Sequence, residues 1–109
     1  MRDLLEEAIT GRLLVNIWYE PGTRTIECHA LGYSSEGHIL LRAFQTDGAS
    51  SSNEHVNWKL FRLDRMRHVE LTKIGFDGPR PGYKLNDRAM TRGIICQLSL
   101  LRSYTAPAA

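Results

Sequence analysis

Cysteine is scarce in this sequence: Cys28 and Cys96 are the only two, they lie far apart, and no CxxC pair or Cys/His cluster surrounds them. That arrangement favours free buried thiols over a disulfide or a zinc site, and we predict no metal and no cofactor. Long apolar runs are also missing. No stretch approaches the roughly 20 residues of a membrane span, and acids at positions 3, 6 and 7 stand where a signal peptide carries its apolar segment. We therefore expect a cytoplasmic protein that does not associate with membranes.

Recognisable catalytic patterns are missing as well. The sequence has no Gly-rich phosphate loop, paired-carboxylate motif, HExxH pattern or nucleophile elbow. Its four histidines are scattered, and His29 and His38 fall on predicted strands, where packed or surface histidines are much commoner than catalytic ones. We expect no catalytic residue and no enzyme.

The composition that remains is that of one globular domain. The chain has 109 residues, of which 42% are apolar and 24% charged, enough for a single modest core. Charge is unevenly spread: residues 1–56 hold four basic and eight acidic residues, a net −4, whereas residues 57–109 hold ten basic and four acidic residues, a net +6. This split predicts an electropositive face able to attract phosphate, and a solvated basic surface is the alternative.

Hydrophobic periodicity predicts a mainly β domain. A helix is expected over residues 3–10, with Asp3 as its cap, Glu6 completing a capping-box pair and Gly11 at its end. Alternation predicts short strands, and turn signals separate them. The strands cover residues 13–20, 25–31, 38–45, a run starting at residue 58 that turns near 64–67, and 68–74. Five such strands are typical of a small barrel, here spanning residues 12–74.

Three further segments have less regular patterns. Residues 46–57 are polar and rich in serine, which predicts a mobile loop. Residues 75–87 are rich in Gly, Pro and charge, so the C-terminal part, 75–109, is expected to wrap the surface and end in a frayed tail at 106–109. Residues 94–101 fit a helix or a strand equally well.

The stretch from Trp58 to Met66 is the most informative. Strand parity places Phe61 and Leu63 on one face with Lys59, and Trp58, Leu60 and Arg62 on the other. We predict that Phe61 and Leu63 join Val15 and Ile17 in the core. Arg62 then shares a face with apolar bulk, which suits the wall of a groove, although an arginine lying over its own strand's tryptophan is the alternative.

Four blocks of the sequence resemble the WYL-domain family in order and spacing, over most of residues 11–72. They are Ile17-Trp18-Tyr19, residues 26–33, residues 37–45, and residues 58–65, where Phe61-Arg62-Leu63-Asp64-Arg65 is similar to the family's Phe-Arg-Leu-Asp-Arg signature. Two positions depart from the family pattern. The naming Trp-Tyr-Leu positions read His38-Ile39-Leu40, and a usual proline is Cys28, as in a divergent branch with an altered ligand pocket.

The resemblance implies a five-stranded, Sm-like or SH3-like barrel that senses a ligand, often nucleic acid or a nucleotide, in transcription regulation, phage defence and DNA-damage responses. Members of the family usually carry a winged-helix domain as well, but 109 residues leave room only for the barrel and its flanks, so we expect a stand-alone version. The carried-over ligand contacts are Tyr19, Arg42, Arg62 and Arg65, with His29 and Gln45 on adjoining strands. Arginine forks hold phosphate and a tyrosine offers a stacking surface, which suits this chemistry. For Arg65, an ion pair with Asp64 or Glu70 is an equally good interpretation.

Three functions follow from these observations. The first is regulatory binding of single-stranded nucleic acid or a nucleotide through an arginine-rich face. The second is a protein-interaction or assembly module, with a protein partner or a homo-oligomer formed through strand edges. An enzyme is the third and the least favoured.

Overall fold

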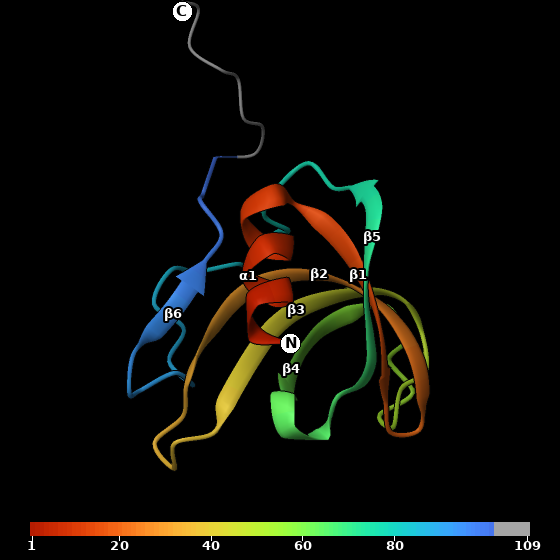
Figure 1. Ribbon diagram of the computed structural model, residues 1–109, viewed down its shortest axis with the longest axis horizontal. Helices are drawn as coiled ribbons and strands as arrows, with labels where there is room; N and C mark the ends of the chain where they lie inside the picture. Colours follow the sequence, from red (N-terminus) through yellow and green to blue (C-terminus); the bar gives the residue numbers. More distant parts are fainter. Residues whose placement is uncertain (102–109) are drawn as a thin grey trace, which may run out of the picture.

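The computed structural model describes residues 1–101, and the predicted frayed tail at 106–109 lies outside the described residues. The domain is mainly β, as predicted, with one short α-helix (Figure 1). In chain order the elements are α1 (Arg2–Gly11), β1 (Leu13–Tyr19), β2 (Gly22–Tyr33), β3 (Ile39–Gly48), β4 (Asn57–Arg62), the 3-10 helix η1 (Leu63–Arg65), β5 (Arg67–Gly75) and β6 (Ile94–Gln97). Among these residues no helix combines the length and hydropathy needed to cross a bilayer.

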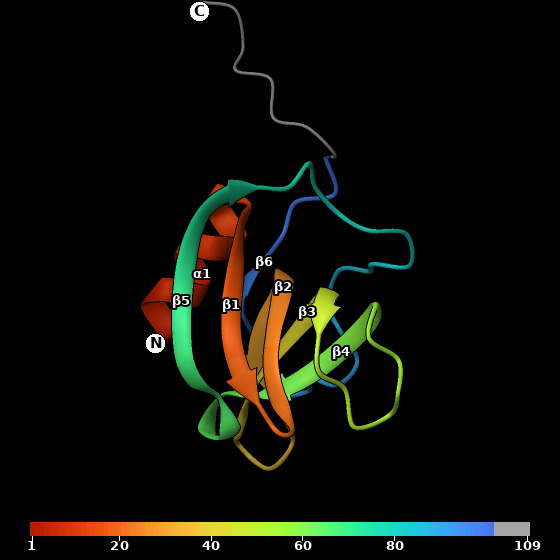
Figure 2. The same ribbon diagram turned by 90° about the vertical axis from the view of Figure 1, so that its right-hand side faces the viewer.

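The strands form one antiparallel sheet in the order β4-β3-β2-β1-β5, and β6 pairs with the C-terminal half of β2. Figure 2 shows the sheet strongly curved, with β4 and β5 on opposite sides of it. Within residues 1–101 no ladder joins β4 to β5. The described residues therefore form a six-stranded open sheet, and a closed five-stranded barrel is not confirmed. The backbone N–H of Arg62, at the end of β4, donates to the Tyr19 hydroxyl at 3.3 Å and so is not available to a closing strand.

The helix begins one residue earlier than predicted. Met1 is its N-cap and makes no side-chain capping bond, while Asp3 lies in the first turn. There the unpaired backbone N–H groups still stabilise its negative charge. The predicted Asp3 cap is thus wrong. Leu5, Ala8 and Ile9 are fully buried, since the 3.6-residue period places them on one face. The helix ends at Gly11, as predicted, and Arg12 adopts a left-handed conformation just after it.

The second and third strands are longer than predicted from the sequence. The turn occupies Glu20 and Pro21, so β2 starts at Gly22, within the predicted Pro21-Gly22 turn, and β3 continues to Gly48, whose φ is +111°. At Gly48 an added Cβ would lie 2.3 Å from the carbonyl oxygen of Thr23, so this close approach of two strands requires glycine. The polar loop is correspondingly shorter than predicted, because its first three residues belong to β3.

The main core lies between α1 and the concave side of the sheet. Of the predicted core residues, Val15, Ile17 and Phe61 are at most 1% exposed. Leu63 is only partly buried and packs against this cluster. It belongs to η1, so the predicted strand from Trp58 ends at Arg62. Strand parity within β4 is nevertheless confirmed, since Phe61 is buried and Leu60 is 39% exposed.

Residues 76–93, which we call the strap, contain no helix or strand and lie across the convex side of β2, β3 and β4 (Figure 2). The strap leads into β6, so the ambiguous segment 94–101 starts as a strand rather than a helix. A small second cluster, with Met90 against Ala30 and Leu40, lies beneath the end of the strap.

Candidate functional site

The convex face of β3 and β4 brings two of the predicted ligand residues together. Arg42 lies opposite Leu60, and Arg62 lies opposite Leu40. The two arginines are therefore diagonal neighbours on one face, a separation of about 7 to 8 Å between backbone positions. Phe44 and Trp58 form the next pair on the same face, so arginines and aromatic rings share this surface, as the parity of the sequence indicates.

Two arginine-carboxylate ion pairs join the strap to this face of the sheet. The Arg80 guanidinium makes two bonds to the Glu27 carboxylate, at 2.8 and 3.0 Å, and lies 4.6 Å from the centre of the Phe44 ring. The Arg42 guanidinium makes two bonds to Asp87, at 2.7 and 3.2 Å. Forked arginine-carboxylate pairs of this kind are directional as well as attractive, so they determine where the strap lies.

His29 is the third docking point, and it is a predicted site residue. Strand alternation places it on the same face as Glu27, the face that the strap covers, and it is the unpaired residue at a register shift between Cys28 and Ala30. The ring is fully buried, edge-on to Trp58 with centroids 4.6 Å apart. Its Nε2 accepts the backbone N–H of Arg80 at 3.1 Å, and its Nδ1 lies 2.8 Å from the Glu27 carbonyl oxygen. Burial lowers the pKa of this imidazole below its ordinary value.

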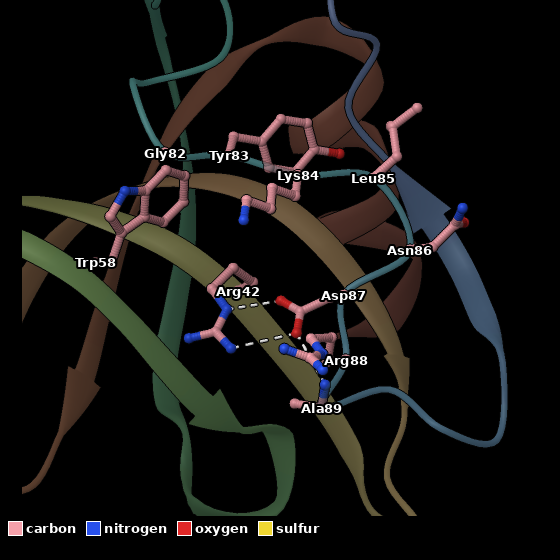
Figure 3. A pocket seen from close by; sticks show the side chains of 10 residues that line it. All are labelled: Arg42, Trp58, Gly82, Tyr83, Lys84, Leu85, Asn86, Asp87, Arg88 and Ala89. Carbon is pink, nitrogen blue, oxygen red and sulfur yellow. Dashed lines mark hydrogen bonds and ion pairs between the residues drawn. The ribbon is translucent and has the colours of Figure 1, made fainter.

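Between the strap and the sheet lies a pocket of about 400 Å³ (Figure 3). The Trp58 indole lies on one side and the Arg42–Asp87 pair on another, with the Lys84 side chain extending toward the space between Trp58 and Arg42. Within residues 1–101, neither Lys84 nor Arg88 has a hydrogen-bond or ion-pair partner. The lining residues are Arg42, Trp58, Gly82, Tyr83, Lys84, Leu85, Asn86, Asp87, Arg88 and Ala89.

The charge of this pocket is positive. Asp87 is its one carboxylate, and although burial opposes ionisation of Asp87, hydrogen bonds from Arg42 and the Ala89 N–H outweigh that effect and lower its pKa. Asp87 is therefore ionised and neutralises Arg42, which leaves the ammonium of Lys84 and the guanidinium of Arg88 as the unneutralised charges. An aromatic wall with two such cations can hold a flat ring and an anionic group at once.

The structure places Tyr19 and Gln45 away from this pocket. The Tyr19 ring packs edge-on against Phe61 in the core, 4.8 Å between centroids, with the Arg24 guanidinium 5.2 Å from its centre. Gln45 is fully buried; it accepts a bond from Arg24 and donates to the carbonyl oxygens of Ala49 and His55. Gln45 thus ties down both ends of the polar loop.

Arg62 and Arg65 also lie outside the residues that line the pocket. Arg62 makes two bonds to Asp64, at 3.0 and 2.6 Å, and its Nη2 lies 3.3 Å from His38 Nδ1. That hydrogen-bonded pair raises the pKa of Arg62 and lowers that of Asp64. Asp64 therefore pairs with Arg62, while Arg65 is exposed on η1. Of the six predicted residues, only Arg42 lines the pocket, and His29 anchors the strap that forms it.

Sequence reasoning missed Trp58, Tyr83, Lys84 and Arg88 as site residues. A signal was present, since Lys84 and Arg88 follow Tyr83 in a segment rich in Gly and Pro. Strand periodicity could not reveal that this segment folds back over β4. Over residues 1–101 no three His, Cys, Asp or Glu side chains gather in a way that could hold a metal ion.

Comparisons with known proteins add no assignment. No protein-family model, curated protein or solved structure matches the chain. The resemblance to WYL domains therefore stays a prediction, and the site must be interpreted from its own geometry.

Proposed function

We propose that the domain is a non-enzymatic binding module for single-stranded nucleic acid or a nucleotide, and that the ligand occupies the pocket beneath the strap. One observation carries this proposal: the pocket combines the Trp58 indole with the unpaired cations of Lys84 and Arg88. Base-aromatic stacking contributes about 1 to 3 kcal/mol per base, and cationic side chains supply the phosphate contacts that make such binding salt-dependent.

The proposed fold relationship is to Sm-like and SH3-like barrels of the WYL type. Its support is a curved antiparallel path of five strands that follows one short helix. The signature-like block also has coherent roles, because Phe61 fills the core and Arg62 pairs with Asp64. On this proposal, the altered residues at the family's naming positions accompany a ligand pocket built largely by the strap.

We place assembly through strand edges second. Side chains occupy two of the main-chain groups that a partner strand would need on β4: the N–H of Arg62 donates to Tyr19, and the N–H of Trp58 donates to Asn57 Oδ1 at 2.8 Å. Side-chain capping of an edge disfavours strand addition. Exposed Leu60 and Val56, 39% and 62% accessible, are the features that favour a protein partner.

The test is binding of a fluorescent single-stranded oligonucleotide and of nucleoside monophosphates at about 50 mM salt, where phosphate contacts are strong. Replacing Lys84 and Arg88 together with glutamine keeps most of the side-chain length and removes both charges. We expect about tenfold or greater weakening, since a charge-assisted bond contributes about 1.5 to 3 kcal/mol. Arg42→Gln is a poorer probe, because it leaves the part-buried Asp87 carboxylate unpaired.

The matched control removes two charges elsewhere. Lys73→Gln with Arg67→Gln changes the net charge equally on β5, at the opposite end of the sheet path from β4, and we expect a much smaller effect. Equal losses in the two double variants would mean nonspecific attraction and would exclude the pocket. If the wild-type protein binds none of the probes, the nucleic-acid proposal fails and the protein-interaction alternative takes its place.

A further inference from the structure

Several polar contacts hold the strap on the sheet, among them two ion pairs and the bond from the Trp58 indole to the Pro81 carbonyl oxygen. Among the strap's contacts within residues 1–101, only the one at His29 involves a side chain that ordinarily changes charge near neutral pH. The ion pairs Arg80–Glu27 and Arg42–Asp87 join guanidinium and carboxylate groups, which ordinarily keep their charges between about pH 5.5 and 8. The contact at His29 joins its imidazole to the backbone of Arg80, and histidine is the side chain that ordinarily titrates in that interval.

The hydrogen-bond pattern fixes the protonation state of His29 while the strap is docked. A backbone N–H can only donate, so Nε2 of His29 must carry a lone pair toward Arg80. Nδ1 then carries the proton and donates it to the carbonyl oxygen of Glu27. A second proton on Nε2 would point directly at the Arg80 N–H. Protonation of His29 and docking of the strap at Arg80 therefore exclude each other.

The surroundings of His29 give the cation little compensation. From β2, the Glu27 carboxylate is nearby, but both of its oxygens are engaged by the Arg80 guanidinium of the strap. β4 contributes the neutral Trp58 ring, and the strap adds Phe76 and Tyr83, whose hydroxyl donates to the Leu98 carbonyl oxygen. A buried imidazolium without a free acceptor is costly.

We propose that His29 is a pH-sensitive latch that holds the strap on the sheet while its imidazole is neutral. Strap docking lowers the affinity of His29 for a proton, so the docked state is fully stable above the ordinary imidazole pKa of about 6.5 and loses stability as the pH falls below it. Because the strap forms most of the pocket wall, opening it dismantles the pocket. That consequence for ligand binding rests on the proposed function, whereas the latch itself does not.

The experiment is an NMR titration of the ligand-free full chain from about pH 8 to about pH 5, the interval in which histidine charges. It follows the His29 ring, the Arg80 amide and the Trp58 indole N–H, which is bonded to the Pro81 carbonyl oxygen at 3.0 Å. A Trp18→Phe variant assigns the indole signals. We expect one shared midpoint, and each unit by which docking lowers the His29 pKa gives about tenfold weaker docking once His29 is protonated.

Two variants identify the sensor. His29→Gln retains an amide oxygen that can accept the Arg80 N–H but does not titrate, so the strap signals should stay constant over the same interval. His55→Gln is the matched control, because His55 also has its Nδ1 against a backbone carbonyl, that of Gly48 at 2.7 Å, but is exposed. It should retain the wild-type transition.

Several results would overturn the latch. Titration of the His29 ring with no change at Arg80 and Trp58 would show that docking tolerates the imidazolium. A transition that persists in His29→Gln would assign the response to Glu27 or Asp87. Should His29→Gln fail to fold, coincidence of the three wild-type midpoints decides the matter alone. Absence of oligonucleotide binding at every pH would remove the proposed function and leave the latch intact.

Discussion

Replacement of Phe61 by alanine measures how strongly one strand position supports the core. The ring is 1% exposed, packs edge-on against Tyr19 and lies beneath the Arg24 guanidinium, 5.4 Å from its ring centre. Removing a buried phenylalanine costs about 3 to 5 kcal/mol, because apolar contacts disappear and a cavity remains. A domain of this size has about 5 to 15 kcal/mol of stability in total, so Phe61→Ala should remove between about a fifth and all of it.

The neighbouring residue supplies the control. Leu60 occupies the opposite face of β4 and is 39% exposed, so Leu60→Ala should cost less than about 1 kcal/mol. Urea unfolding followed by circular dichroism gives both values, and a slope of about 1 to 2 kcal/mol per molar urea converts the Phe61 loss into a midpoint shift of roughly 1.5 to 5 M. Comparable losses at the two positions would refute the assignment of Phe61 to the core.

Two further predictions concern the strap and the polar loop. Gly32→Ala places a methyl group 2.7 Å from the Gly93 carbonyl oxygen, so it should destabilise the domain by about 1 to 3 kcal/mol through overpacking. Gly11→Ala meets only ordinary contacts and should show no loss of thermal stability. Equal melting temperatures of the two variants would contradict the close approach at Gly32. Gln45→Leu removes the bonds to Arg24 and to both ends of the loop, so it should cost about 1 to 3 kcal/mol and speed proteolysis within residues 49–56. Unchanged cleavage would show that Gln45 does not hold the loop.

Local patterns in the sequence determined the secondary structure well where one physical period dominates. The face of the helix that buries Leu5 and Ala8, the presence of a turn at Pro21, and the alternation that buries Phe61 beside exposed Leu60 all follow from side-chain periodicity and backbone preference. Strand ends were less predictable. Thr23 and Asp47 extend their strands because neighbouring strands offer hydrogen bonds, Thr23 opposite Trp18 and Asp47 opposite Thr25. Their polar side chains give no sign of this in the sequence.

The roles of the predicted site residues depended on partners that are distant in sequence. Arg42 looked like a ligand contact, but Asp87, 45 residues later, neutralises it. Arg80 likewise reaches back 53 residues to Glu27. The sequence alone determined that these groups are charged and that the C-terminal part runs over the surface. Only the tertiary structure decided where it docks, because docking requires the register of β2 and β3 that places Glu27, His29 and Arg42 on the same side of the sheet. Contacts of this kind join elements whose separation along the chain leaves no periodic trace, so the pocket exists only once the strap has folded back over β4.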